Sequence, residues 1–403
     1  MKRVRLLRGD RGIWAMFILL SVISLVGVYT SIGLYAYSNF SSKTPTALFL
    51  RHLIIVCATY VAMIVISHIN YRTFSRFALL AYWVTLVLLG VMFVLRKRWL
   101  HVPLIGQFQP SEVAKIVLII FVARLLSLKK DQLNELGTFI QLLFVIALPV
   151  ALVLPGNFSM AALIFLVCFL MMLLGGVNRK YWWRVMLVGL LLVGVYLTTT
   201  YKRYEKSINT GQAAVEYGIG REPTWGHRLY AWVNPQPDEL TQENMARMAI
   251  ARGGLVGAGV GNTVHARLMT QAHNDFIYAI IIEETGLLGG LVVFIIYSVL
   301  YFRCVKLTWR CKGRFGALTV TGIGTVIYLQ AILNMCVAVG VLPVTGQTLP
   351  FVSFGGTAYL LMGCGLGVIQ SIANDVNAKE REQQQAVAAA AATDKTANNE
   401  SNN

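Results

Sequence analysis

The sequence predicts an all-α polytopic membrane protein with ten transmembrane helices and a long extracytoplasmic loop between the seventh and the eighth. Of its 403 residues, 56% are hydrophobic and only 13% are charged, which is too apolar for the charged surface of a soluble domain. The apolar residues form runs long enough to cross a hydrocarbon core of about 30 Å. Because these runs do not alternate apolar and polar residues, they predict helices rather than a barrel.

Each apolar run is expected to form one helix, because backbone groups in lipid must hydrogen bond within their own segment. The runs cover approximately residues 13–37, 47–69, 77–95, 112–128, 138–155, 159–176, 181–200, 276–302, 315–341 and 350–374. The first run is too long for a removable signal peptide, and no small-residue cleavage site follows it. We therefore expect a basic cytoplasmic N-terminus at 1–12, a membrane domain at 13–375 and a disordered cytoplasmic tail at 376–403.

Basic residues mark one side of the predicted membrane domain. They precede the first run and recur in alternate loops, as Lys2, Arg3, Arg72, Arg76, Lys129, Lys130, Arg179, Lys180, Arg310 and Lys312. The positive-inside rule places these loops and both termini in the cytoplasm. The net charge of +17 is therefore interpreted as a topology signal that also attracts anionic lipid, and not as a nucleic-acid surface. The six cysteines lack CxxC spacing and the sequence has no HExxH motif, so neither disulfide nor metal site is predicted.

The outer segment after the third run carries two candidate features. Arg96–Arg98 lie on the outer side, against the positive-inside rule. Their side chains either reach the lipid headgroups or bind an anionic group such as a phosphate. Glu112 and Lys115 begin the fourth run three residues apart, so they lie on one helical face and can pair. That pair is either structural or part of a site.

The loop from about 201 to 275 is by far the longest, and it mixes cations, carboxylates and aromatic residues. Loops of this length are usually functional. Within it, "ENMARMAIARGG" predicts a short helix that ends at Gly253 and Gly254. The glycine-rich "GGLVGAGVGN" at 253–262 follows no strand and faces away from cytoplasmic nucleotides. It predicts tight turning or a close approach of the backbone to a ligand, not nucleotide binding.

Asp275 stands at the outer boundary of the eighth run, directly after Asn274. An Asn or Asp in this place can cap the helix. Asp275 also lies beneath a loop of cations, where a carboxylate could act as a general base. Spacing alone leaves both alternatives open. His273 has the ordinary pKa of a proton carrier but is expected to be a loop residue.

Glu283 and Glu284 lie inside the eighth apolar run. Glu283 is about 12 Å deeper along the helix than Asp275 and about 80° round it, and Glu284 is about 180° round, so neither can share one site with Asp275. Acids inside a membrane are functional candidates by default. The alternative, an internal hydrogen-bonded pair that fixes helix packing, is favoured for both, and their protonation stays open.

The segment 339–363, between the last two runs, cannot be one regular helix. It contains Pro343, Gly346, Pro350, Gly355 and Gly356, together with the hydrogen-bonding residues Thr345, Gln347, Thr348 and Ser353. Broken backbone at membrane depth is tolerated only inside the protein or along a cavity. The segment therefore predicts a wall of a polar cavity, or else a re-entrant packing element.

Four blocks together carry a resemblance to a known family. They are "QPSEVAK" at 109–115, "ARGGLVGAGVGN" at 251–262, "HNDFIYAIIIEETGLLG" at 273–289 and "LPVTGQTLPFVSFGG" at 342–356. In this order, and over essentially the whole chain, they resemble the SEDS family of shape, elongation, division and sporulation proteins, the RodA and FtsW class. The resemblance implies a peptidoglycan glycosyltransferase that polymerises lipid II at the outer face of the bacterial cytoplasmic membrane. It also implies a class B penicillin-binding transpeptidase as partner, with other cell-division membrane proteins at the septum.

The resemblance places the family's catalytic aspartate on Asp275 and its glutamate and lysine on Glu112 and Lys115. A carboxylate here can take the proton of the acceptor sugar hydroxyl. Cations and polar groups could bind the substrate and its departing pyrophosphate, namely Arg98, Lys115, Arg228, Arg252, Thr345 and Ser353. The family's acidic "PDxGT" block reads "PGNFS" here, with Asn157 and Ser159, so a role for that acid is in doubt.

Other functions remain as alternatives. A lipid II flippase or transporter would suit intramembrane acids and broken helices, although no inverted repeat is evident and the candidate residues gather on one face of the membrane. A scaffold that activates the transpeptidase is a third hypothesis. "LPVTG" leans toward an elongation-type polymerase, whereas "QTLP" and "HNDFIYA" favour the division type, which we prefer. No cofactor is evident, and a divalent-cation requirement stays open.

Overall fold

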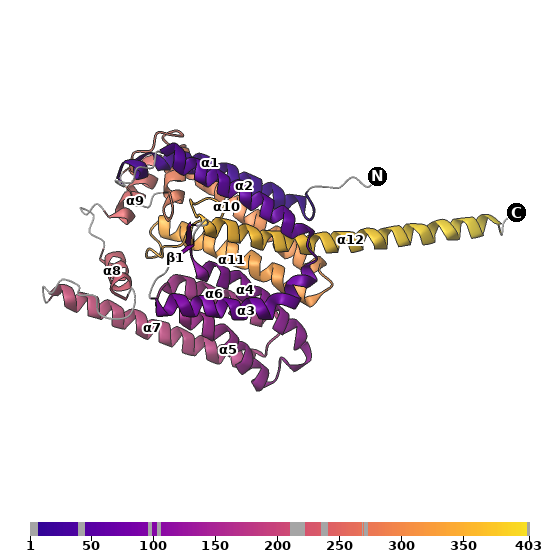
Figure 1. The fold of residues 1–403 in the computed structure, drawn as a ribbon. Helices are drawn as coiled ribbons and strands as arrows, with labels where there is room; N and C mark the ends of the chain where they lie inside the picture. Colours follow the sequence, from indigo (N-terminus) through magenta and orange to yellow (C-terminus); the bar gives the residue numbers. More distant parts are fainter. Residues whose placement is uncertain are drawn as a thin grey trace.

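Long helices form most of the computed structural model (Figure 1). The structure describes residues 7–38, 45–95, 99–102, 106–209, 222–234, 241–267, 269 and 273–400. The long helices are α1 (Arg11–Ser38), α2 (Pro45–His68), α3 (Tyr71–Val94), α4 (Pro110–Leu128), α5 (Leu136–Val153), α6 (Phe158–Leu174), α7 (Arg179–Asn209), α10 (Ile277–Arg310), α11 (Arg314–Ala338) and α12 (Thr357–Glu400). The shorter elements are β1 (Leu100–Val102), β2 (Gly106–Phe108), η1 (Lys130–Gln132), α8 (Glu222–Val233), α9 (Gln242–Gly253) and η2 (His265–Arg267).

The long helices confirm the predicted polytopic membrane fold. Within the described residues, eight helices are long and apolar enough to cross a membrane, and α6 is a shorter apolar helix. The remaining long helix, α4, spans 19 residues and carries Glu112, Lys115 and Arg124. Together these helices occupy the ten predicted runs, because a helix lets each run satisfy its own backbone hydrogen bonds.

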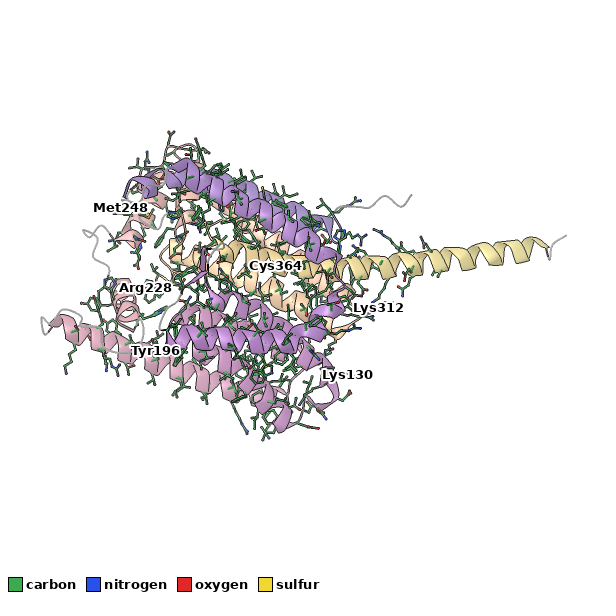
Figure 2. All side chains as sticks on the ribbon, viewed as in Figure 1. Lys130, Tyr196, Arg228, Met248, Lys312 and Cys364 are labelled. Carbon is green, nitrogen blue, oxygen red and sulfur yellow. The ribbon has the colours of Figure 1, made fainter. Side chains whose placement is uncertain are left out.

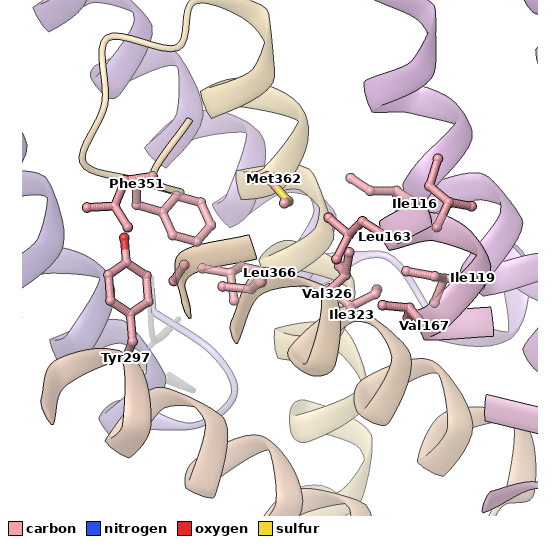
Figure 3. Close-up of a cluster of buried hydrophobic side chains, with 14 of the residues drawn as sticks. Ile116, Ile119, Leu163, Val167, Tyr297, Ile323, Val326, Phe351, Met362 and Leu366 are labelled. Carbon is pink, nitrogen blue, oxygen red and sulfur yellow. The ribbon is translucent and has the colours of Figure 1, made fainter. Parts of the chain in front are cut away.

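Helices α11 and α12 lie at the centre of the bundle. In their membrane-spanning stretches 67% and 72% of residues are buried, against 6% in the peripheral α7. α12 packs along α2, while α11 packs against α10, α4 and α6. Figure 3 shows the resulting contact of side chains from α4, α6, α11 and α12, including Ile119, Leu163, Ile323 and Leu366. These central helices supply the rigid frame on which the polar groups described below are mounted.

Close helix contacts in this core depend on a small residue. A Cβ atom placed on Gly322 of α11 would lie 2.5 Å from Ile119 Cγ2 and 2.5 Å from Met171 Sδ. Glycine therefore lets α11 approach α4 and α6 closely, which is the usual means of packing helices in lipid. A larger residue at position 322 would push these helices apart.

Labelled residues mark the two ends of the bundle. Lys130 and Lys312 lie at the end from which the C-terminal part of α12 leaves, and Arg228 and Met248 lie at the opposite end (Figure 2). We call these the inner and outer ends. At the inner end the N-terminal segment is tied to α12, because the Asn377 side chain donates to the Gly9 carbonyl at 3.0 Å.

Several boundaries differ from the sequence-based expectation. α7 continues to Asn209, beyond the apolar run, because Lys, Arg and Glu are good helix formers once the chain has left the lipid. The expected long loop from residue 201 therefore begins within α7, and it contains α8 as well as the predicted helix α9. A short antiparallel hairpin, with Leu100 opposite Phe108, was not expected.

The C-terminal tail also differs from the expectation of disorder. α12 continues as a helix through Glu400 and projects alone from the inner end (Figure 1). The prediction rested on the absence of an apolar face to bury, and it underestimated the helix propensity of the Ala- and Gln-rich sequence. The base of the projection is anchored by Arg310, whose guanidinium bonds Glu380 and, at 2.7 Å, Asn377.

Candidate active site

Asp275 lies in a short turn that is bound through its backbone to the broken segment between α11 and α12. The Asn334 side chain donates to the Asp275 carbonyl at 2.8 Å, and Ser353 Oγ donates to the Asn274 carbonyl at 2.6 Å. The Phe354 N–H donates to the His273 carbonyl at 2.9 Å. Three successive carbonyls are thus satisfied by protein donors, which fixes the backbone of the turn that carries the half-buried Asp275 side chain.

Helix capping does not explain the position of Asp275. The N-cap residue of α10 is Phe276, so neither Asn274 nor Asp275 occupies the capping position that the sequence suggested. This boundary does not support the capping alternative, and the chemical role of Asp275 stays a prediction. Burial lowers the pKa of the neighbouring His273 to about 4, so this imidazole is neutral at neutral pH and does not compete as a proton carrier there.

Arg228 comes to the same place from α8. A Cβ atom placed on Gly346 would lie 3.7 Å from Asp275 Oδ2 and 3.7 Å from Arg228 Nη1. Arg228 Nη1 also donates to the Val344 carbonyl at 3.2 Å, and Trp232 Nε1 to the Gly340 carbonyl at 3.2 Å. α8 thus docks on the 340–346 backbone through two side chains one helical turn apart, and the guanidinium and the carboxylate both approach Gly346.

The segment 342–356 is irregular, as predicted, and protein donors satisfy its backbone. Ser159 Oγ donates to the Thr345 carbonyl at 3.0 Å, Asn334 Nδ2 to the Gln347 carbonyl at 2.7 Å, and Gln330 Nε2 to the Thr348 carbonyl at 2.9 Å. Ser353 Oγ accepts from the Leu349 N–H at 2.7 Å. Non-helical backbone at membrane depth requires such partners, because lipid cannot form hydrogen bonds with its N–H and C=O groups. Of the predicted site residues, Ser353 binds backbone groups of this segment and of the Asp275 turn, and the Thr345 carbonyl accepts from Ser159.

Glu112 and Lys115 form the predicted pair, and a third residue joins them. Lys115 Nζ lies 2.8 Å from Glu112 Oε2 and 2.7 Å from Gln330 Oε1, and the lysine is fully buried. Since Gln330 also bonds the Thr348 carbonyl, the pair is linked to the 342–356 segment. Gln330 and Asn334, one turn apart on α11, are functional candidates that the sequence interpretation missed.

Arg252 and Glu283 belong to a different contact. Glu283 accepts from Arg252 Nη1 at 2.7 Å, from Thr263 Oγ1 at 2.6 Å and from His265 Nδ1 at 2.9 Å, and it is fully buried. The favoured structural role of Glu283 is therefore supported, but its partners are residues of the outer loop and it does not pair with Glu284. The Glu284 carboxylate instead accepts from the Gly261 N–H at 3.2 Å. The predicted substrate contact of Arg252 finds no support in this geometry.

The glycine-rich segment 253–262 makes the expected close backbone approach, but to α10 and not to a ligand. A Cβ atom placed on Gly257 would lie 2.3 Å from the Glu284 carbonyl oxygen, and one placed on Gly286 would lie 2.2 Å from the Leu255 carbonyl oxygen. Gly286, with φ of 74°, breaks α10 at this contact. The Ala258 N–H donates to the Glu283 carbonyl at 2.9 Å. The glycines therefore let the outer loop lie directly on α10.

Arg98 and a possible metal site are the two remaining features of the predicted site. The predicted substrate-binding Arg98 lies outside the described residues. Among the residues that the structure describes, no group of three or more His, Cys, Asp or Glu side chains could hold a metal ion. The described site is thus built from the carboxylates of Asp275 and Glu112, the cations of Arg228 and Lys115, and amide or hydroxyl groups, a set suited to proton transfer and to an anionic polar substrate.

Fold and site together define a multi-pass helical membrane protein in which an acid, Asp275, and a guanidinium, that of Arg228, both approach Gly346. A family model for FtsW, RodA and SpoVE, described as "Cell cycle protein", matches residues 10–378. The chain belongs to this family.

Individual relatives agree with this assignment. The chain is 26% identical over 380 residues to a probable peptidoglycan glycosyltransferase FtsW of Geobacter sp. strain M18, covering 90% of this chain and 96% of that protein. It is 29% identical over 378 residues to a protein of the same name from Coxiella burnetii, covering 89% and 95%. With stage V sporulation protein E of Bacillus subtilis it shares 27% identity over 373 residues, covering 88% and 94%.

Solved structures share the fold. A chain from a peptidoglycan synthase complex aligns with a TM-score of 0.67 at 21% identity and covers 91% of this chain and 98% of that one. The rod shape determining protein RodA of Thermus thermophilus aligns with a TM-score of 0.63 at 20% identity, covering 91% and 97%. At this identity the likeness concerns the arrangement of helices.

Proposed function

We propose that the protein is a peptidoglycan glycosyltransferase that polymerises lipid II at the outer face of the cytoplasmic membrane. The observation that carries this proposal is the meeting of Asp275 and Arg228 at Gly346. A sugar hydroxyl is a poor nucleophile until it loses its proton, and a pyrophosphate leaves with negative charge. The site offers one group for each of these tasks.

In the proposed reaction the Asp275 carboxylate takes the proton of the acceptor hydroxyl. The hydroxyl oxygen then forms a bond to the anomeric carbon of the donor sugar. The bond between that carbon and the phosphate oxygen breaks, and its electron pair leaves with the pyrophosphate. General-base assistance typically contributes about 10²–10⁴-fold, and fixed cations such as Arg228 stabilise the developing phosphate charge.

The family relatives support the substrate class and the division role. Several relatives of similar length are called FtsW, and one is a sporulation protein. We therefore propose a division-type polymerase at the septum, with both termini in the cytoplasm. The fold neighbour from a peptidoglycan synthase complex supports a penicillin-binding transpeptidase as partner. A lipid II transporter remains the second candidate, favoured by the broken backbone of 342–356.

Detergent solution separates these two functions, because transport needs two compartments and polymerisation does not. The purified protein, with and without the transpeptidase, is given lipid II, and the products are run on a gel. Glycan strands establish the polymerase. If wild-type protein with its partner forms no strands, the polymerase proposal fails, and uptake of lipid II analogues across proteoliposomes tests transport.

A further inference from the structure

A cavity lies at the inner end of the bundle, where the start of α3, the turn between α10 and α11, and the departing part of α12 come together. Its volume is about 130 Å³, which is room for several water molecules at about 30 Å³ each, or for a phosphate-sized group. Its walls converge, since a Cβ atom placed on Gly316 would lie 3.6 Å from Tyr71 Cε2 and 3.4 Å from Ile372 Cγ2. Three segments that are distant in sequence thus enclose space that their own side chains do not fill.

Positive charge exceeds negative charge in the lining of this cavity. Three cations, Arg310, Lys312 and Lys379, face two carboxylates, Asp375 and Glu380. Lys379 Nζ donates to Asp375 Oδ2 at 2.6 Å. Lys312 is exposed and makes no hydrogen bond or ion pair with any residue that the structure describes. The lining therefore carries one positive charge that its own carboxylates do not balance.

Arg310 is held in a fixed orientation beside this charge. Its Nε donates to Glu380 Oε1 at 2.9 Å, and its Nη2 donates to Asn377 Oδ1 at 2.7 Å. Within the described part of the chain, Nη1 has no acceptor. A guanidinium carries five N–H groups in a rigid plane, so the contacts on one edge orient the remaining donors. Such a preorganised guanidinium is well suited to a phosphate group.

The surroundings of the cavity indicate the depth of a lipid head group. Trp309, directly before Arg310, is 83% exposed, and tryptophan is enriched where membrane helices meet the membrane–water interface. The cavity lies at the turn that joins two apolar helices long enough to cross a membrane, α10 and α11. The apolar side chains Ile372 and Val376 of α12 form another part of its wall. Cations and apolar groups are therefore combined at one level.

This combination favours a phospholipid over a free phosphate ion. A phosphate diester with a single negative charge matches the one unbalanced positive charge of the lining, and the lipid's glycerol backbone can lie against Ile372 and Val376. A free phosphate ion gains nothing from an apolar wall. A zwitterionic lipid brings its own cation, which Lys312 repels. Basic pockets between helices at a membrane surface bind the head groups of anionic lipids.

We propose that the cavity between α3, the α10–α11 turn and α12 binds the phosphate of an anionic phospholipid head group, with Arg310 and Lys312 as its donors. The site lies at the inner end, where Figure 2 labels Lys312, whereas Arg228 of the candidate active site lies at the opposite end. The proposal therefore goes beyond the glycosyltransferase function and does not depend on it.

The test measures lipid binding by the purified full-length protein in neutral detergent. Phosphatidylglycerol or phosphatidylcholine with the same acyl chains is titrated in, and native mass spectrometry gives the fraction of protein that retains lipid. Lys312→Gln removes the unpaired ammonium, and Asp375→Asn removes a negative charge from the lining. Lys306→Gln is the matched control, because Lys306 is an exposed lysine one helical turn before Arg310 that does not line the cavity. Thermal unfolding confirms that each variant is folded.

Wild type should bind phosphatidylglycerol at least about fivefold more tightly than phosphatidylcholine, and Lys312→Gln should lose about fivefold in affinity for phosphatidylglycerol, the effect of one basic residue at an anionic lipid surface. Asp375→Asn should bind phosphatidylglycerol more tightly than wild type, because Lys379 is then free to join the site. Lys306→Gln should stay within about twofold of wild type, since an exposed charge outside the cavity is screened.

Three results would overturn the proposal. One is equal affinity of wild type for the two lipids. Another is an equal loss of affinity in Lys312→Gln and Lys306→Gln, which would show attraction by the whole basic surface and not by the cavity. The last is displacement of phosphatidylglycerol by an equal concentration of inorganic phosphate, which would identify a free-phosphate site. None of these measurements requires polymerisation, so a failure here leaves the proposed function standing, and the reverse also holds.

Discussion

Arg228 of α8 and Asp275 of the turn before α10 meet at Gly346, where a single added Cβ atom would lie 3.7 Å from a side-chain atom of each. The guanidinium is held by the Val344 carbonyl, and the carboxylate is positioned by the backbone bonds of its own turn. A proton acceptor and a fixed positive charge are therefore placed together by two segments that are distant in sequence.

Loss of the guanidinium should slow polymerisation. Arg228→Ala should lower kcat by about 10²-fold or more, the usual effect of removing one preorganised stabilising group. Arg228→Lys should recover only part of the rate, because an ammonium cannot reproduce the guanidinium geometry. Gel assays of glycan formation measure both. Arg184→Ala, an exposed arginine of α7, serves as control, and equal rates for Arg228→Ala and the control would contradict the assignment.

Removal of the Glu283 charge should destabilise the protein. Glu283→Gln leaves Arg252, His265 and Thr263 without their shared carboxylate, and because Arg252 is partly exposed, the loss should cost about 1–3 kcal/mol. Thermal unfolding in detergent should show a clear fall in Tm. Glu284→Gln keeps an amide oxygen that can still accept from the Gly261 N–H, so it should change Tm much less. Similar falls in the two variants would show that Glu283 does not anchor the outer loop.

Glu112 and Lys115 should behave as a coupled unit. Lys115→Met leaves a buried carboxylate without its partner, and Glu112→Gln leaves a buried ammonium. The double variant removes both charges, so it should be more stable than the sum of the single effects by about 1–3 kcal/mol. Additive effects on the unfolding free energy would exclude coupling. Polymerisation by the stable double variant would make the pair structural, and lost activity would support substrate binding.

His273 should make stability depend on pH. Burial lowers its pKa to about 4 from an ordinary value of 6.5, so the unfolded chain binds the proton more readily than the folded protein. The stabilising contribution is present above pH 6.5 and is lost as pH falls toward 4, by roughly 3 kcal/mol over the full range. Between pH 7 and 4.5, Tm should therefore fall less for His273→Asn than for wild type. The exposed His68→Asn control should follow wild type, and parallel curves for His273→Asn would contradict the expectation.

The helices were predictable because, in lipid, the polar backbone of an apolar segment must form its hydrogen bonds within that segment. Their ends were harder to predict. Polar residues after position 200 marked the end of the lipid-facing stretch, but a helix does not need to stop there, and α7 continues to Asn209. The tail after residue 376 likewise continues as a helix, because its Ala- and Gln-rich sequence has a high helix propensity even where no other element packs against it.

The site was predictable where local spacing determines the contact, as for Glu112 and Lys115 three residues apart. Contacts between distant segments were not predictable in this way. Gln330 and Asn334 stand four residues apart in an apolar run, a spacing that predicts one polar helical face, but the sequence does not show which segment that face meets. Arg252 was assigned to substrate from its place in a cationic loop, whereas the glycine contacts with α10 bring it to Glu283.

The most direct test of the central claim is the polymerisation rate of Asp275→Asn on lipid II. The substitution removes the proton acceptor but keeps the backbone carbonyl that Asn334 holds, so Tm and lipid II binding should stay close to wild type. The rate should fall by at least about 10²-fold, while Asp131→Asn, an exposed acid at the inner end, should polymerise normally. A folded Asp275→Asn protein that forms glycan strands at the wild-type rate would contradict the account.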